Sequence, residues 1–181
     1  KCLGSLCEES ILDDLEVLVI NDGSSDNTEQ VASVYAEKHP GTFRVISKEN
    51  GGWGSTVNTG MREATGKYFR LLDADDWYFT ENLPEYIALL KEVETDLVLA
   101  RYGLYSEKLQ RVYAYKSIPV DDNKFGKVYR YFDWCFKYEI LMHCLAVKTE
   151  LLKKANFEIL DHCFYTDVQF TLCTTIYAET F

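Results

Sequence analysis

Several familiar functional signatures are missing from this sequence of 181 residues. The six cysteines form no CxxC pair and no Cys/His cluster with zinc-finger spacing, which argues against a structural zinc module. GxSxG is absent, and so is GxxxxGK followed by Ser or Thr, which argues against a serine-hydrolase elbow and a P-loop. The three histidines are scattered, and we expect His39, His143 and His162 to be structural or surface residues.

Basic charge and long apolar runs are also scarce. Nineteen Lys and Arg residues face 29 Asp and Glu residues, giving a net charge of −10. This balance argues against a broad basic surface for nucleic acid or an anionic membrane. No apolar run is long enough to cross a bilayer. We therefore expect no nucleic-acid partner and no membrane span in this chain.

The cysteines indicate the redox setting. A chain of this length with 47% hydrophobic residues can bury a real core and needs no disulfide bonds. We expect buried, reduced thiols in a cytoplasmic protein. The cysteines are Cys2, Cys7, Cys135, Cys144, Cys163 and Cys173. The chain starts without Met and already looks helical over residues 1–10, which favours a fragment of a longer protein.

The first hundred residues alternate predicted strands and helices at short spacing. Such alternation is typical of an α/β fold around a parallel or mostly parallel sheet, in which ligands bind beyond the carboxyl ends of the strands. The second half is less regular, with one expected strand over 143–149 and two helices, the last starting near Thr166. The expected strands of the first half are 16–21, 43–47, 67–72 and 96–100.

The stretch RLLDADDWYF sets three carboxylates, Asp73, Asp75 and Asp76, directly after an apolar strand. Like charges this close repel one another unless a cation or a set of donors compensates them. A divalent cation such as Mg²⁺ or Mn²⁺ prefers such oxygen ligands, and a nucleoside diphosphate can supply the others. The alternative is a solvated capping loop, and the motif alone does not decide.

Two further loops carry candidate ligand-binding residues. Asp22 follows a buried strand and could accept hydrogen bonds from a base or a ribose, or could simply belong to a turn. The glycines of ENGGWGSTVNTG do not match the GxGxxG pattern, because Val57 stands where the third glycine should be. These glycines could let the backbone approach a nucleotide, or they could allow tight packing. Asn58 lies on the helix expected to begin near Ser55, where it could orient a ligand or an acid.

A late acid completes the set. Asp167, in YTDVQF, lies at the expected start of a helix, where the helix dipole favours the charged form. A carboxylate there could take a proton from a sugar hydroxyl, or it could be an ordinary first-turn acid.

Together the segments EVLVINDGSSDNT, KENGGWGSTVNTGMREATGKYFRLLDADDW and FYTDVQF resemble family 2 glycosyltransferases in order and spacing. The resemblance implies a GT-A-like three-layer sandwich around a mostly parallel sheet, with the family's first strand missing from this chain. It further implies one domain over 1–181, with a nucleotide-sugar half at 1–100 and an acceptor and base half at 101–181.

The resemblance also assigns roles. It implies that Asp22 contacts the base, Asp73 the ribose side and Asp75 a Mg²⁺ or Mn²⁺ ion, with Asp73 also a metal ligand. Gly52 and Asn58 would contact the donor, and Asp167 would be the general base.

The implied reaction is an inverting, metal-dependent hexosyl transfer. The donor would be a nucleoside-diphosphate sugar, with uridine the favoured base, and the acceptor a glycan or lipid-linked hydroxyl. The implied setting is bacterial surface polysaccharide or glycolipid synthesis at the inner face of the membrane.

Three departures from the family pattern keep other readings open. The first strand is missing, Val57 stands where many members have Arg, and Thr166 stands where many have Glu. These departures favour a degenerate nucleotide- or glycan-binding module. A sugar-nucleotide pyrophosphorylase is a further alternative, although no glycine-rich loop with Arg and Lys supports it.

The aromatic excess of the second half could stack on sugar rings or fill the core, and we favour the core. The residues concerned are Tyr102, Tyr105, Tyr113, Tyr115, Tyr129, Tyr131 and Trp134.

Overall fold

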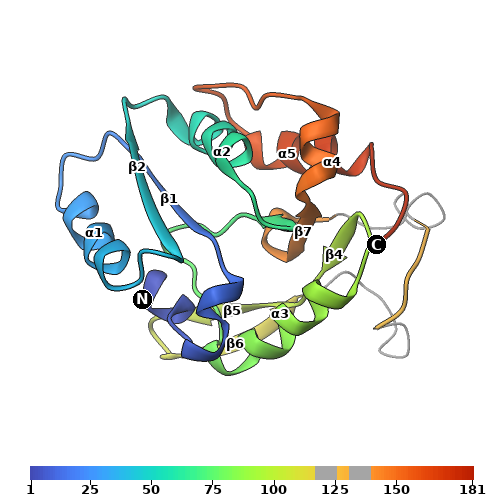
Figure 1. Ribbon diagram of the computed structural model, residues 1–181, viewed down its shortest axis with the longest axis horizontal. Helices are drawn as coiled ribbons and strands as arrows, with labels where there is room; N and C mark the ends of the chain where they lie inside the picture. Colours follow the sequence, from blue (N-terminus) through green and yellow to red (C-terminus); the bar gives the residue numbers. More distant parts are fainter. Residues whose placement is uncertain (117–125, 131–139) are drawn as a thin grey trace.

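The computed structural model describes residues 1–116, 126–130 and 140–181 (Figure 1). The first half follows the predicted alternation of strands and helices, although residues 1–10 contribute short 3₁₀ helices rather than one α-helix. Just before the first α-helix, the Asp26 Oδ1 accepts a hydrogen bond from the Thr28 N–H at 2.9 Å. The 3₁₀ helices are η1 (Leu3–Leu6), η2 (Glu9–Asp14), η3 (Thr80–Asn82) and η7 (Met142–Cys144). The α-helices are α1 (Thr28–Lys38), α2 (Gly52–Glu63), α3 (Leu83–Glu92), α4 (Thr149–Ala155) and α5 (Thr166–Thr175).

The strands in the described residues form three separate hydrogen-bonded groups. β1 (Val17–Asp22) and β2 (Phe43–Lys48) pair in parallel, and β3 (Tyr68–Arg70) and β4 (Leu97–Leu99) both pair antiparallel to β7 (Leu145–Lys148). The third group is the antiparallel hairpin of β5 (Tyr102–Ser106) and β6 (Arg111–Lys116).

The sheet is interrupted between β1 and β3. In the residues that the structure describes, these two strands do not pair, and a cavity of about 700 Å³ lies between them. Its walls include Leu18 and Ile20 of β1 and Phe69 of β3.

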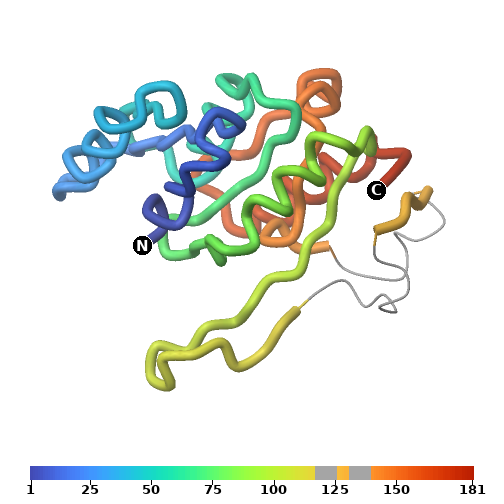
Figure 2. Tube along the Cα trace, turned by 60° about the horizontal axis from the view of Figure 1, so that its bottom comes forward, coloured from blue at the N-terminus to red at the C-terminus, as the bar shows by residue number. Residues whose placement is uncertain are grey.

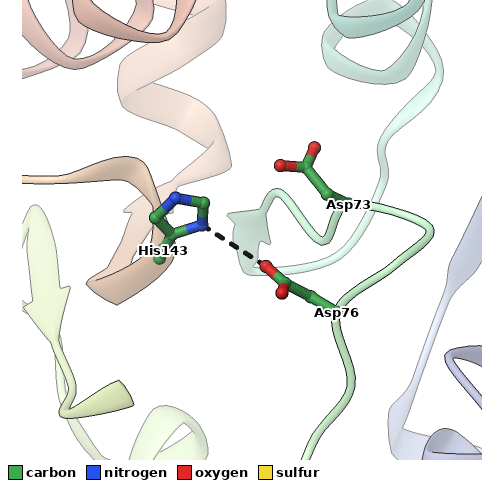
Figure 3. Close-up of side chains that lie close together, drawn as sticks. All are labelled: Asp73, Asp76 and His143. Atoms are coloured by element: carbon green, nitrogen blue, oxygen red, sulfur yellow. Dashed lines mark ion pairs between the residues drawn. The ribbon is translucent and has the colours of Figure 1, made fainter. Parts of the chain in front are cut away.

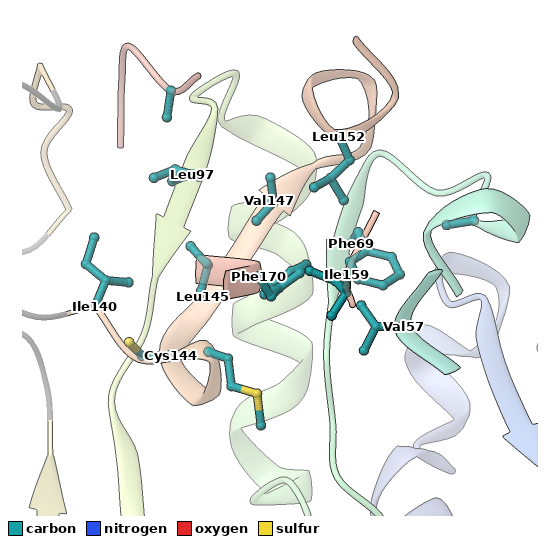
Figure 4. Close-up of a cluster of buried hydrophobic side chains, with 13 residues drawn as sticks. Val57, Phe69, Leu97, Ile140, Cys144, Leu145, Val147, Leu152, Ile159 and Phe170 are labelled. Atoms are coloured by element: carbon teal, nitrogen blue, oxygen red, sulfur yellow. The ribbon is translucent and has the colours of Figure 1, made fainter. Parts of the chain in front are cut away.

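The larger hydrophobic core lies between the β3–β7–β4 group and helices α2, α4 and α5. Leu145, Ala146 and Val147 of β7 are at most 1% exposed, and Phe170 of α5 packs against Phe69 with ring centroids 6.2 Å apart. Figure 4 shows this cluster, with side chains from the strands and helices meeting around Phe170. A smaller core joins α3 to η1, η2 and β2. The two cores fix the loops at the strand ends from both sides.

The β5–β6 hairpin extends away from the rest of the chain (Figure 2). Tyr113 and Tyr115 are 58% and 68% exposed, so the core interpretation is wrong for these two residues. Tyr115 nevertheless lies near Phe79, with ring centroids 6.5 Å apart. Tyr131 and Trp134 lie outside the described residues.

The five cysteines within the described ranges are free thiols, as expected. The expectation of burial holds for Cys144, only in part for Cys2, Cys7 and Cys173, and fails for Cys163, which is exposed. Its loop leads into α5 along the surface. No helix in the described part of the chain is both long and apolar enough to span a membrane.

Candidate functional site

The carboxylate of the first candidate residue, Asp22, accepts three hydrogen bonds from its own chain. Its Oδ1 accepts from Lys48 Nζ at 2.6 Å and from the Gly51 N–H at 3.0 Å, and its Oδ2 accepts from the Gly52 N–H at 2.8 Å. Burial alone would raise the pKa of Asp22, but these hydrogen bonds outweigh it and hold the pKa below its ordinary value. As a charged carboxylate, Asp22 therefore joins the end of β1 to the glycine loop, the segment around Gly51 and Gly52 at the start of α2.

The same hydrogen bonds explain where α2 begins. The helix starts at Gly52 rather than near Ser55, because Asp22 satisfies N–H groups at its first turn, which a helix leaves without internal partners. Gly52 has φ +81°, a conformation that favours glycine. At Gly54 an added Cβ would lie 2.3 Å from the Leu160 carbonyl oxygen. Tight packing therefore accounts for Gly54, while donor contact by Gly52 stays a prediction.

The acidic loop after β3 is a tight turn, closed by the Asp76 N–H donating to the Asp73 carbonyl at 3.0 Å. The indole Nε1 of Trp53, in the first turn of α2, donates to Asp73 Oδ1 at 3.3 Å. Asp73 thus lies against the glycine loop, and the two loops predicted to bind the donor meet.

His143 is distant from the acidic loop in sequence but lies close to it in space. Its Nδ1 lies 3.5 Å from Asp76 Oδ2, and ligand atoms of Asp73, Asp76 and His143 all lie within 4.8 Å of one another (Figure 3). Burial raises the pKa of Asp76, the charges of Asp73 and Asp75 add to this, and His143 opposes it. We expected His143 to have only a structural or surface role. That expectation did not include its approach to Asp76, because no local sequence pattern indicates this contact.

Asp75 is exposed and lies outside this group of three. Its assignment as a metal ligand stays a prediction. The structure brings together Asp73, Asp76 and His143 instead, and mixed carboxylate and imidazole ligands suit a divalent cation such as Mn²⁺.

Asn58 holds the segment that leads to Asp167. Its Nδ2 donates to the Ile159 carbonyl and its Oδ1 accepts from the Ile159 N–H, both at 2.8 Å. Gln169 of α5 holds the neighbouring residues, accepting from the Leu160 N–H at 3.0 Å and donating to the Glu158 carbonyl at 3.1 Å. Both polar atoms of Asn58 are therefore engaged by protein backbone, and donor contact by Asn58 stays a prediction.

Asp167 is the second residue of α5 and is exposed. The segment before it contains Asn156, His162 and Tyr165, with φ of 47°, 50° and 61°. Non-glycine residues rarely adopt such values, and they concentrate at functional sites. Asp167 lies outside the group of Asp73, Asp76 and His143, so its role as a base stays a prediction.

Curated relatives support the same assignment as these motifs. Over 102 residues the chain is 36% identical to the putative glycosyltransferase EpsH of Bacillus subtilis, covering 56% of this chain and 29% of EpsH. Over 104 residues it is 36% identical to an uncharacterized glycosyltransferase of Rickettsia prowazekii, covering 56% of this chain and 31% of that protein. The chain thus spans about a third of the length of these relatives.

Solved structures show the same fold. The chain superposes on S. aureus TarS 1–349 in complex with UDP-GlcNAc with a TM-score of 0.74 at 22% identity, covering 98% of this chain and 49% of TarS 1–349. The UDP complex gives a TM-score of 0.73 at the same identity, with 98% and 51% covered. This GT-A arrangement confirms the predicted α/β fold class. Residues 1–155 match the family described as "Glycosyl transferase family 2", and on this match the chain belongs to glycosyl transferase family 2.

Proposed function

We propose that this chain forms the donor-binding and catalytic part of an inverting hexosyltransferase. It would move a sugar from a uridine-diphosphate sugar to an acceptor hydroxyl. The observation that carries this proposal is the meeting of Asp73, Asp76 and His143 beside the glycine loop of α2. Family membership and the fold shared with TarS, solved with UDP and UDP-GlcNAc, support a uridine donor.

The donor would lie between the ends of β1 and β3. Asp22 and Gly52 border the base side, and Asp73 borders the ribose side. Asn58 contributes to the donor side, or acts through Ile159 by fixing the segment before Asp167. Residues 1–100 supply the donor half and residues 101–181 the base and acceptor half of one domain.

The transfer is a single displacement. The acceptor oxygen forms a bond to the anomeric carbon while the bond from that carbon to the diphosphate oxygen breaks. The acceptor proton moves to the Asp167 carboxylate, and the bonding electron pair leaves with the diphosphate. A single displacement of this kind inverts the anomeric centre.

A divalent cation fits the acidic loop, because the loop gathers carboxylates with no Lys or Arg ion pair among the described residues. Asp73 and Asp75 are the predicted ligands. When bound, Mg²⁺ or Mn²⁺ supplies positive charge that stabilises the departing diphosphate.

The acceptor would be a glycan or a lipid-linked sugar in surface polysaccharide or glycolipid synthesis. The similarity to EpsH of Bacillus subtilis supports a bacterial setting. The activated sugar would be taken from the cytoplasm, with the enzyme at the inner face of the membrane.

A binding module without turnover is the second candidate. The observation that favours it is the cavity of about 700 Å³ that interrupts the sheet between β1 and β3, next to the donor site. Release of UDP from a UDP-sugar by the purified chain would exclude this alternative.

The first test is thermal unfolding with UDP, GDP, CDP or dTDP, each with and without Mn²⁺. A nucleotide at a hundredfold excess over its Kd stabilises the folded state by about 2.7 kcal/mol. We expect stabilisation by UDP with Mn²⁺, and its loss in Asp75→Ala.

The control is Asp13→Ala, which removes an exposed acid of η2 and should leave the UDP response unchanged. Equal stabilisation by all four nucleotides would contradict a uridine donor. No stabilisation by any nucleotide would contradict the donor site.

A further inference from the structure

His143 is placed at the acidic loop by contacts that a surface histidine would not need. Its carbonyl accepts from Nη2 of Arg70 at 2.5 Å, and its ring lies 5.6 Å from that of Tyr102. Its neighbours Met142 and Cys144 are 8% and 2% exposed. The backbone on both sides is therefore fixed by the core, and the imidazole faces Asp76 (Figure 3).

Arg70 explains why this position is rigid. Its guanidinium also donates to the Tyr86 hydroxyl at 2.9 Å and lies 5.3 Å from the Tyr86 ring. Arg70 thus ties the end of β3, which leads into the acidic loop, to α3 and to η7. The loop and the histidine are held by the same side chain, so their approach is a property of the packed core.

We propose that His143 is a ligand of the divalent cation, and that it shares the ion with Asp73 and Asp76. The proposal rests on the proposed function, and it adds Asp76 and, from another part of the chain, His143 to the predicted ligands Asp73 and Asp75. One atom from each of the three residues lies within 4.8 Å of the others, so a small shift toward a common ion would bring all three to bonding distance.

This ligand set predicts which metal the site prefers. Carboxylates suit both Mg²⁺ and Mn²⁺, whereas imidazole nitrogen favours transition metals. A site that combines carboxylates with one imidazole therefore selects Mn²⁺ over Mg²⁺. A site made of carboxylates alone would discriminate less between the two ions.

The competing explanation is that His143 only forms an ion pair with Asp76. Both explanations predict that replacing His143 perturbs the loop, so activity does not separate them. Direct detection of a bond between Mn²⁺ and a histidine nitrogen does.

The experiment uses the 181-residue chain with ¹⁵N-labelled histidine and Mn²⁺ alone as the probe. Pulsed electron paramagnetic resonance detects nitrogen bound to Mn²⁺, and the signal of free Mn²⁺ gives the dissociation constant. We expect a ¹⁵N coupling in the wild-type chain. In His143→Gln the coupling should vanish and Mn²⁺ should bind roughly tenfold more weakly or worse.

Two further variants sharpen the result. Asp76→Asn should weaken Mn²⁺ binding but retain the coupling when Mn²⁺ is saturating. His162→Gln, which removes an exposed imidazole outside the group, should change neither quantity. Absence of bound Mn²⁺ or of the coupling in the wild-type chain would overturn the proposal. A coupling that persists in His143→Gln would overturn it too.

Failure of the proposed function would appear separately. In that case no UDP would be released from UDP-sugars, while the ¹⁵N coupling persisted. Loss of the coupling with intact UDP release would reject only the role of His143.

Discussion

Asp22 and Asp75 carry the same side chain, and their surroundings give them different roles. Asp22 is 18% exposed and accepts three hydrogen bonds, from Lys48, Gly51 and Gly52. Asp75 is exposed and lies outside the group around His143. Asp22 therefore contributes to folding whatever its role toward a nucleotide, whereas Asp75 is free to serve a ligand.

We expect Asp22→Asn to lower the free energy of unfolding at pH 7 by about 1–3 kcal/mol, because hydrogen bonds to a charged acceptor weaken. The folded pKa of Asp22 lies below its unfolded value of about 3.9. Its stabilisation is therefore complete above that value and is lost as the pH falls through the folded pKa.

The difference between wild type and Asp22→Asn should accordingly shrink below about pH 4. Urea unfolding from pH 7 down to about pH 3 measures it. A difference that stays constant across this range would show that the carboxylate charge is not the stabilising feature.

Helix α2 connects the glycine loop to the segment before Asp167. It can pack closely against that segment because residue 54 is a glycine and has no side chain. The Leu160 carbonyl oxygen lies 2.3 Å from the position that a Cβ of residue 54 would take, and Asn58 binds the adjacent Ile159 backbone. The helix and the segment are therefore in backbone contact, and the position of one sets the position of the other.

We expect Gly54→Ala to lower the free energy of unfolding by about 1–3 kcal/mol through overpacking, with the segment over 158–160 forced away from α2. The matched control is Gly41→Ala, where nothing lies within 4 Å of the added Cβ. The control should change stability by less than about 0.5 kcal/mol. Equal stability of the two variants by urea unfolding would contradict the close packing at Gly54.

At the scale of the whole molecule, the strands differ in how deeply they are buried. β7 lies between two partner strands and is almost fully buried, whereas β1 pairs with β2 alone among the described strands and borders the cavity. Figure 1 shows α4 and α5 near β7 and β4, whereas β1 and β2 lie between α1 and α2. The proposed donor site thus lies between a well-buried group of strands and a less buried one.

Native-state hydrogen exchange should reveal this difference. We expect the amides of Leu145–Lys148 to exchange at least roughly tenfold more slowly than those of Val17–Asp22, since buried and doubly paired strands open last. Mass spectrometry of the two segments measures it. Equal protection would mean that β1 and β7 open in one cooperative unit.

The sequence by itself determined the α/β class and located β1, β2, β3, β4 and β7 along the chain, because apolar runs and turn residues act over a few neighbouring residues. It also located the acidic loop after β3. It predicted neither the β5–β6 hairpin nor the antiparallel pairing of β3 and β4 with β7. Only the tertiary structure decided that His143 meets Asp76, that Asn58 binds Ile159 and that Tyr115 is exposed. Each of these depends on the path of the chain between distant segments, and no local pattern of hydrophobicity or turn chemistry encodes that path.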